Sequence, residues 1–184
     1  SPYVGLSRGG RTVSTPSCRR LEALSEDDLG ALTEVLVDCV DGGASVSFMA
    51  PLSPARARAY WQSVATSVVA GERLLFVVDD DHGRPAGTVQ VVLAQPDNQP
   101  HRGDVAKMLV HSRMRRRGLG EVLLRAAETG AKAAGKTLLV LDTAGAEAAR
   151  LYERAGWTRV GVIPDYALLP YGGLCATTYY YKGL

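Results

Sequence analysis

A basic, glycine-containing turn between an apolar strand and a helix is the feature that most constrains this chain. The run Arg115-Arg116-Arg117-Gly118-Leu119-Gly120 follows an apolar stretch at 105–110 and precedes a predicted helix over about 119–134. Glycines permit a tight turn, and the N–H groups at a helix N-terminus point outward toward anions. With the arginines, this pattern predicts a pyrophosphate site. It matches neither a Walker loop, which needs Lys and Ser or Thr after the last glycine, nor GxGxxG.

The hydrophobic pattern of the rest of the chain predicts one mixed α/β domain. Strands are expected at 18–24, 74–78, 87–93, 105–110, 137–141, 158–163 and 176–181, and helices at 26–41, 54–71, 119–134 and 146–155. Ser25, with Asp28 three residues later, is the expected N-cap of the first helix. Residues 1–16 lack periodicity and predict a flexible tail, which leaves 17–184 for the domain.

The charge balance excludes proteins whose main task is to coat nucleic acid or an anionic membrane. Lys and Arg number 21 and Asp and Glu 19, a net charge of +2. The tail carries Arg8, Arg11 and no acidic residue, so residues 17–184 balance at 19 minus 19, or zero. No apolar run approaches the roughly 20 residues of a membrane-spanning helix.

Cysteines and histidines give no sign of a disulfide framework or a metal site. Cys18, Cys39 and Cys175 are odd in number and far apart, and the three histidines have no ligand spacing with each other or with cysteine. The cysteines are therefore expected to be free thiols, and no metal is expected. Because no secretory signal is visible either, we expect a cytoplasmic protein.

A second motif follows the basic turn at a characteristic spacing. Residues 148–161 combine a helix carrying Leu151-Tyr152 with Gly156-Trp157 before a strand. With both motifs, the chain resembles the GNAT superfamily of acyl-CoA-dependent N-acetyltransferases over about residues 18–182. The resemblance implies a GNAT fold: a single domain with a central mixed sheet of about seven strands, splayed between the fourth and fifth strands, and helices on both faces.

Within the superfamily, the chain is most similar to the tabtoxin-resistance type. The similarity rests on the run GGASVSFMA at 42–50 and on 105–110, 141–143, 158–161 and 181–182. Because the first run lies outside the cofactor-binding positions, it implies a related acceptor pocket for an amine of a small molecule, such as an amino-acid-like or peptide-like antibiotic. Gly145 stands where many relatives have Asn, so no cofactor contact is expected from that side chain.

The resemblance also assigns roles to individual residues. It implies acetyl-CoA as the donor and coenzyme A as the product. Tyr152, of ordinary pKa about 10, is expected near the sulfur, where it would protonate the departing thiolate; the alternative is a purely structural core residue. The expected cofactor-binding residues are Met108, Leu109 and Val110 along the pantetheine arm, Arg115, Arg116, Arg117, Gly118, Leu119 and Gly120 at the pyrophosphate, and Tyr152. An N–H near Met108 or Leu109 would polarise the thioester carbonyl.

Asp104 and Asp142 are the candidate bases. Asp142 ends the predicted fifth strand, where ligands gather in open sheets, whereas Asp104 precedes the predicted fourth strand and is placed by the resemblance. Both are expected at the same end of adjacent parallel strands. A carboxylate of pKa about 4 is a poor base for an ammonium of pKa about 10. A water chain, burial of Asp104 or binding of the ammonium before proton loss stays open, as does a structural role for either residue.

Direct transfer is expected, because Cys175 has no neighbouring His or basic residue in sequence that would activate it as a nucleophile. Two other functions stay open. A protein or peptide N-acetyltransferase would need a long open groove, whereas the loops 42–53 and 164–174 could wall off a small pocket. A non-catalytic acyl-CoA-binding sensor would share the basic turn but need neither acid nor base. A homodimer is also open.

Overall fold

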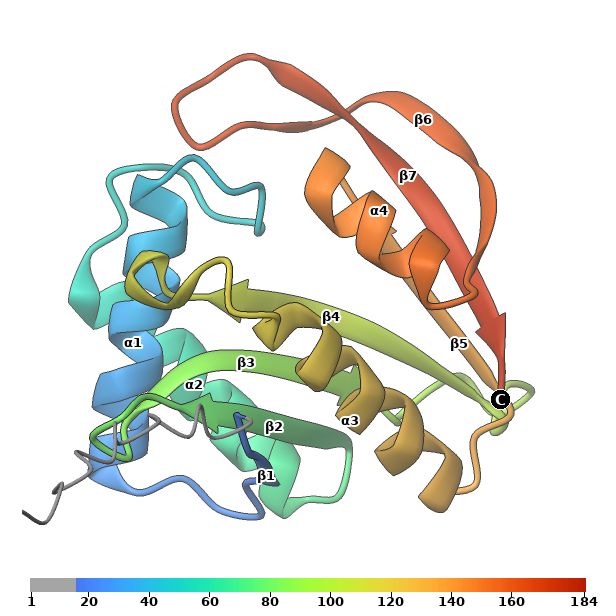
Figure 1. Ribbon diagram of the computed structural model, residues 1–184, viewed down its shortest axis with the longest axis horizontal. Coiled ribbons are helices and arrows are strands. Elements are labelled where there is room, and N and C mark those ends of the chain that lie inside the picture. The colour runs from blue at the N-terminus through green and yellow to red at the C-terminus, as the bar shows by residue number, and fades with distance from the viewer. Residues whose placement is uncertain (1–15) are drawn as a thin grey trace, which may run out of the picture.

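Seven strands form one mixed sheet in the computed structural model, which describes residues 16–184 (Figure 1). The sheet order is β1-β2-β3-β4-β5-β7-β6, and only the β4–β5 pair is parallel. The strands are β1 (Cys18–Arg20), β2 (Arg73–Asp79), β3 (Pro85–Val92), β4 (Arg102–Val110), β5 (Leu138–Thr143), β6 (Thr158–Leu168) and β7 (Leu174–Gly183). This confirms the predicted fold class. The predicted flexible tail, except for its last residue, lies outside the described residues.

Helices cover both faces of the sheet, as predicted (Figure 1). They are α1 (Glu26–Asp41), α2 (Pro54–Val69), α3 (Leu119–Ala133) and α4 (Ala146–Arg154), with a short 3₁₀ turn η1 (Ser112–Met114). In β2, Leu75 and Val77 pack with α1 and α2, whereas Leu74, Phe76 and Val78 pack with α3. Alternate side chains of a strand face opposite sides, so a strand covered on both faces reads as one continuous apolar run. Within residues 16–184, each helix falls short of the length and apolar character that a bilayer-spanning segment requires.

Local signals place the ends of most elements correctly. Ser25 Oγ accepts a hydrogen bond from Asp28 N (3.1 Å), and the Asp28 carboxylate accepts one from Ser25 N (3.0 Å), so the expected cap is a complete capping box. Three strand ends differ from the prediction by three residues or more. β1 stops at Arg20, β4 begins at Arg102 because it pairs with β5 from that residue, and β6 continues to Leu168 because β7 pairs with it as far as that residue. The β4 and β6 ends depend on cross-strand pairing that local sequence does not contain.

The sheet opens between β4 and β5, as the resemblance implied. Their parallel pairing covers only Arg102–Asp104 with Leu138–Val140, although both strands continue beyond it. β4 also bulges: Ala106 pairs with Gln90 and Leu109 with Thr88, so two residues of β4 oppose Val89, and Lys107 takes a φ of 52°. Such a bulge bends a strand and redirects its side chains. β5 meanwhile pairs along its other edge with β7.

Two glycines inside helices make a matched test of packing. In α3, a Cβ added to Gly130 would meet Phe76 Cζ at 2.5 Å, whereas in α1 the atom nearest such a Cβ on Gly30 is Arg84 Nη2 at 3.9 Å. Gly→Ala inside a helix gains about 1 kcal/mol in propensity. We expect Gly30→Ala to stabilise the protein by roughly that amount. Gly130→Ala should destabilise it by about 1–2 kcal/mol, because overpacking outweighs propensity. Urea unfolding of the two variants measures the difference, and equal stabilities would contradict the close packing of α3 on β2.

Candidate active site

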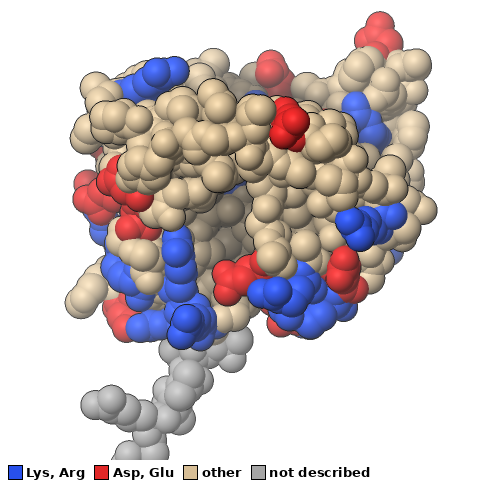
Figure 2. Space-filling model, turned by 90° about the horizontal axis from the view of Figure 1, so that it is seen from above, with Lys and Arg blue, Asp and Glu red and all other residues tan. Residues whose placement is uncertain are grey.

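A cavity of about 540 Å³ lies where β4 and β5 separate. Seen from above, this face of the molecule is hollowed near its centre, and Lys and Arg side chains gather along one edge (Figure 2). The lining segments are the α1–α2 loop (44–49), β4 (105–108), the end of β5 with the turn after it (141–145), β6 (166–168) and β7 (175–177), with Ala148 and Tyr152 of α4. Segments far apart in sequence therefore meet at the split in the sheet.

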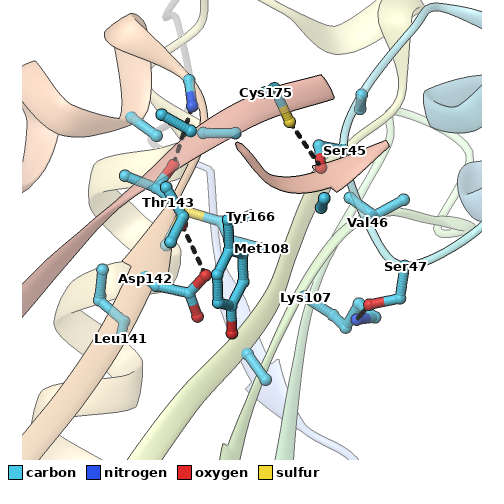
Figure 3. Close-up of a pocket in the computed structure, with 18 of the residues that line it drawn as sticks. Ser45, Val46, Ser47, Lys107, Met108, Leu141, Asp142, Thr143, Tyr166 and Cys175 are labelled. Carbon is cyan, nitrogen blue, oxygen red and sulfur yellow. Dashed lines mark hydrogen bonds between the residues drawn. The ribbon is translucent and has the colours of Figure 1, made fainter. Parts of the chain in front are cut away.

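The α1–α2 loop and the β6–β7 hairpin are joined across one side of this cavity. Ala50 N donates a hydrogen bond to the Pro170 carbonyl (2.9 Å), and the Tyr171 hydroxyl donates one to the Asp41 carbonyl (2.7 Å). Deeper in, Cys175 Sγ lies 3.9 Å from Ser45 Oγ (Figure 3). These contacts close the gap between the two loops, so the cavity is bounded on this side.

The basic turn forms the N-terminus of α3. Gly118, the N-cap residue, has φ 72° and ψ 18°, a left-handed conformation that favours glycine, and it makes no side-chain cap hydrogen bond. The N–H groups of the first turn are therefore not capped by a side chain, and Arg115, Arg116 and Arg117 beside them are exposed. This is the anion-binding geometry that the sequence predicted.

Two residues of the turn, Leu119 and Gly120, pack against other parts of the fold, which limits how they can contact a ligand. The Leu119 side chain is buried in the core, so only its backbone N–H is free to act. A Cβ on Gly120 would lie 3.1 Å from Leu151 Cδ2, so this glycine lets α3 and α4 approach each other. The turn is also anchored to α1, because the Asp38 carboxylate accepts hydrogen bonds from Ser112 N (2.8 Å) and Ser112 Oγ (2.7 Å).

Beyond Asp104, the edge of β4 that faces β5 has no strand partner in the described chain. Backbone N–H and C=O groups along such an edge are available to an extended ligand. Met108 lines the cavity, whereas the Leu109 side chain is buried against α1 and α2 and could contribute only its backbone. The Val110 carbonyl accepts a weak hydrogen bond from the Cys39 thiol (3.6 Å).

Tyr152 is both a core residue and a cavity residue. Its ring lies 5.8 Å from those of Trp157 and Tyr180, and the residue is 5% exposed, yet it lines the cavity. None of the hydrogen bonds found within residues 16–184 involves its hydroxyl. Burial, and then the charge of Asp142, raise the pKa of Tyr152 to about 12. The hydroxyl therefore keeps its proton at neutral pH and can act as a donor.

The two candidate carboxylates occupy different surroundings. Asp142 lines the cavity and accepts a hydrogen bond from Thr177 Oγ1 (2.7 Å). Asp104 is not among the cavity-lining residues; it is paired with Arg102 and accepts a hydrogen bond from Gln95 Nε2 (3.2 Å).

The prediction that both carboxylates lie at the same end of parallel strands is wrong for Asp104. It is the third residue of β4, level with Val140, because pairing with β5 extends β4 back to Arg102, before the apolar run begins.

Two further polar side chains that the sequence did not single out, Lys107 and Tyr166, line the cavity, and Tyr179 contacts the second of them. Lys107 Nζ donates a hydrogen bond to Ser47 Oγ (2.9 Å), and burial lowers the pKa of this lysine (Figure 3). The Tyr166 and Tyr179 hydroxyls lie 3.1 Å apart; this hydrogen bond, followed by burial and the charge of Asp142, raises the pKa of Tyr179 to about 12. A signal for Lys107 was present, because it is the one charged residue in the apolar run 105–110. No local signal marks Tyr166, which reaches the cavity through the pairing of β6 with β7.

Comparison with known proteins identifies a sequence family and a fold that this chain shares. Residues 44–157 match the sequence profile described as the acetyltransferase (GNAT) family. A phosphinothricin acetyltransferase of the GNAT superfamily from Sinorhizobium meliloti, solved with acetyl-CoA, is 18% identical, with a TM-score of 0.77 over 93% of this chain and 89% of that one.

Two other solved structures are similarly close. A ribosomal-protein-alanine N-acetyltransferase from Brucella melitensis is 19% identical, with a TM-score of 0.76 over 91% of this chain and 99% of that one. An N-acetyltransferase from Staphylococcus aureus is 17% identical, with a TM-score of 0.75 over 92% and 99% of the two chains. At these identities the three structures establish a shared fold.

Proposed function

The chain belongs to the acetyltransferase (GNAT) family, and from this premise we propose that it transfers the acetyl group of acetyl-CoA directly to the amine of a small molecule. The observation that carries the proposal is the bounded cavity at the β4–β5 split, which holds the Tyr152 hydroxyl and the Asp142 carboxylate. The proposed acceptor is an amino-acid-like or peptide-like compound, and its acetylation would serve resistance or self-protection. Similarity to the Sinorhizobium phosphinothricin acetyltransferase supports this choice.

The residues at the split fit acetyl-CoA. The unpartnered edge of β4 at Met108, Leu109 and Val110 suits an extended pantetheine arm, and the free N–H groups at the α3 N-terminus suit a pyrophosphate. Positive charge there comes from Arg115, Arg116 and Arg117. Gly118 allows the left-handed turn at the start of the helix, Gly120 allows α4 to pack closely, and Leu119 contributes its backbone N–H. The Tyr152 hydroxyl, which has no hydrogen-bond partner among the described residues, is free for the sulfur.

The proposed chemistry assigns one task to each group. Acetyl-CoA, when bound, supplies an activated acetyl thioester. A backbone N–H of Met108 or Leu109 polarises the thioester carbonyl while the acceptor nitrogen forms its bond to that carbon. Tyr152 donates its proton to the sulfur as the carbon–sulfur bond breaks. Asp142 holds the acceptor as an ammonium, which loses one proton through water before it attacks, because a carboxylate alone is too weak a base. The second proton, released from nitrogen after the carbon–nitrogen bond forms, replaces the one that Tyr152 gave to the sulfur. Asp104, on the neighbouring strand, is a secondary candidate that would act through water. Cys175 forms no acyl intermediate.

A small acceptor is favoured over a protein by the contacts that bridge the α1–α2 loop and the β6–β7 hairpin. A polypeptide acceptor, such as that named for the Brucella neighbour, would need these loops to part. Dimerisation and a cytoplasmic location stay predictions. Exposed apolar side chains along β6, among them Val160 and Val162, favour a dimer.

A screen of amines tests the proposed function. We expect acetyl-CoA to release free thiol with at least one amino-acid or antibiotic amine, with a mass increase of one acetyl group on that amine. Mass spectrometry of each reaction, with polyamines and peptides in the same panel, measures this. Tight acetyl-CoA binding without thiol release for any amine would favour the sensor alternative. A stoichiometric acetyl adduct on a cysteine would contradict direct transfer.

Tyr152 and Tyr180 provide a matched pair for the proposed acid. The Tyr180 ring packs beside that of Tyr152, but its hydroxyl donates to Glu153 instead of facing the cavity. We expect Tyr152→Phe to lower kcat by about 10- to 1,000-fold, with the KM for acetyl-CoA little changed. Tyr180→Phe should leave kcat within about threefold. Steady-state kinetics decide, and equal rates in wild type and Tyr152→Phe would remove this tyrosine from the chemistry.

Gly118 and Gly71 separate ligand binding from backbone strain. Both have left-handed φ values, 72° and 75°, and a Cβ on either would meet nothing within 4 Å. Valine at either site should cost about 1–2 kcal/mol of stability. Only Gly118→Val should raise the KM for acetyl-CoA, by about tenfold or more, because it displaces N–H groups that bind phosphate oxygens. Urea unfolding and initial rates measure both effects, and equal KM values for the two variants would contradict the pyrophosphate site.

A further inference from the structure

Two charged side chains face the cavity from the two strands that flank the split. Among the described residues that line it, only Lys107 of β4 and Asp142 of β5 carry a charge at neutral pH. Figure 3 places them apart, Lys107 beside Ser47 and Asp142 beside Tyr166. The rest of the lining is apolar or neutral, including Val46, Phe48, Leu141 and Cys175. The cavity thus presents one positive and one negative group to whatever it binds.

Each of these charged groups has unused hydrogen-bonding capacity. The Lys107 ammonium has three N–H donors and uses one, toward Ser47 Oγ. Asp142 accepts one hydrogen bond, from Thr177, at Oδ2, and Oδ1 has no hydrogen-bond partner among residues 16–184. Neither residue takes part in an ion pair within residues 16–184, with the other or with a third group. Lys107 is half-buried, whereas Asp142 is exposed. A half-buried ammonium outside any ion pair is costly, and a ligand carboxylate beside Lys107 would offset that cost.

The backbone conformation of Lys107 also supports a ligand-binding role. Its φ of 52° is rare for a residue other than glycine, and it occurs inside the bulge of β4. A backbone of this kind costs on the order of 1 kcal/mol and is typical of ligand-binding positions. The bulge places the ammonium beside the α1–α2 loop, whereas the Met108 side chain turns toward Gly120 and α3. Lys107 therefore lies on the side of β4 away from the proposed pyrophosphate site.

We propose that Lys107 and Asp142 together select a zwitterionic acceptor: Asp142 binds the ammonium that is to be acetylated, and Lys107 binds a carboxylate or comparable oxyanion of the same molecule. This inference rests on the proposed function, because it takes Tyr152 to mark the reacting end. Asp142, near the end of β5, and Tyr152 of α4 both line the cavity, so an ammonium at Asp142 shares that space with the Tyr152 hydroxyl. If the acceptor carried a second ammonium in place of the anion, the Lys107 ammonium would repel it. Polyamines should therefore be poor acceptors.

Matched acceptors test the inference without any substitution. The probes are a panel of free L-amino acids, the primary amide of each, and 1,4-diaminobutane. We expect kcat/KM for the best acid to exceed that for its amide by about 10-fold or more, the value of one charge-assisted hydrogen bond. The amine of the amide is less basic and loses its proton more easily than that of the acid. Ease of deprotonation would therefore favour the amide and cannot explain a preference for the acid. Amides used as well as acids, or a preference for the diamine, would overturn the inference.

Variants of Lys107 then assign the preference to this residue. Lys107→Met, which keeps the length of the side chain, should lower kcat/KM for the acid by about 10- to 100-fold and leave that for the amide within about twofold. Lys107→Arg should keep most of the preference. Lys132→Met, which neutralises an exposed lysine on α3, is the control and should match wild type. A Lys107→Met variant that retained the acid preference, or that instead raised the KM for acetyl-CoA, would contradict the assignment.

Calorimetry supplies a readout independent of turnover. Each acid of the panel and its amide are titrated into protein saturated with coenzyme A. The tightest-binding acid should bind at least tenfold more tightly to wild type than to Lys107→Met, and more tightly than its own amide. If no amine is acetylated, the proposed function fails, while the acid–amide comparison in calorimetry still decides whether the cavity selects zwitterions. If amines are acetylated but acids and amides bind equally, only the zwitterion inference fails. If Lys107→Met does not fold, Lys107→Arg and the wild-type comparison suffice.

Discussion

The site depends on the point at which two parallel strands stop pairing. β4 and β5 pair from Arg102 and Leu138 only as far as Asp104 and Val140, yet each strand continues beyond that level. A sheet normally satisfies its backbone groups within itself, so an interruption leaves N–H and C=O groups available along one edge. The same interruption opens the space that the cavity occupies. Because β5 pairs with β7 on its other edge and β4 with β3, the opening is held by strands on both sides.

The other parts of the site are positioned relative to this opening. Gly118 and Gly120 start α3 at the end of β4, and the contact of Gly120 with Leu151 sets the approach of α4, which carries Tyr152. The α1–α2 loop and the β6–β7 hairpin meet over the cavity and bring Ser47 and Tyr166 to it. Acid, carboxylate and ammonium groups from three separate elements, α4, β5 and β4, thereby share one cavity, in which charges interact more strongly than in water.

Sequence reasoning predicted the parts of the site that have local signals. The α3 N-terminus followed from glycines between an apolar run and a helix, and Tyr152 followed from its motif. Asp104 was misplaced because the start of β4 was read from hydrophobicity, whereas Arg102 and Gly103 join the strand through hydrogen bonds to β5. The sequence does not predict a role for Lys107, because a lone lysine in an apolar run has no periodic signature. Its role depends on a bulge, which is defined by the partner strand.

The sequence by itself determined the element order, the capping of α1, the basic turn and the neutral charge of the domain, because each depends on neighbours along the chain. Only the tertiary structure decided how far β4 and β5 pair, which aspartate faces the cavity, and that one lysine opposes it there. These features arise from contacts between residues tens of positions apart. Backbone hydrogen bonding across strands, unlike helix capping or hydrophobic periodicity, leaves little trace in the local order of residues.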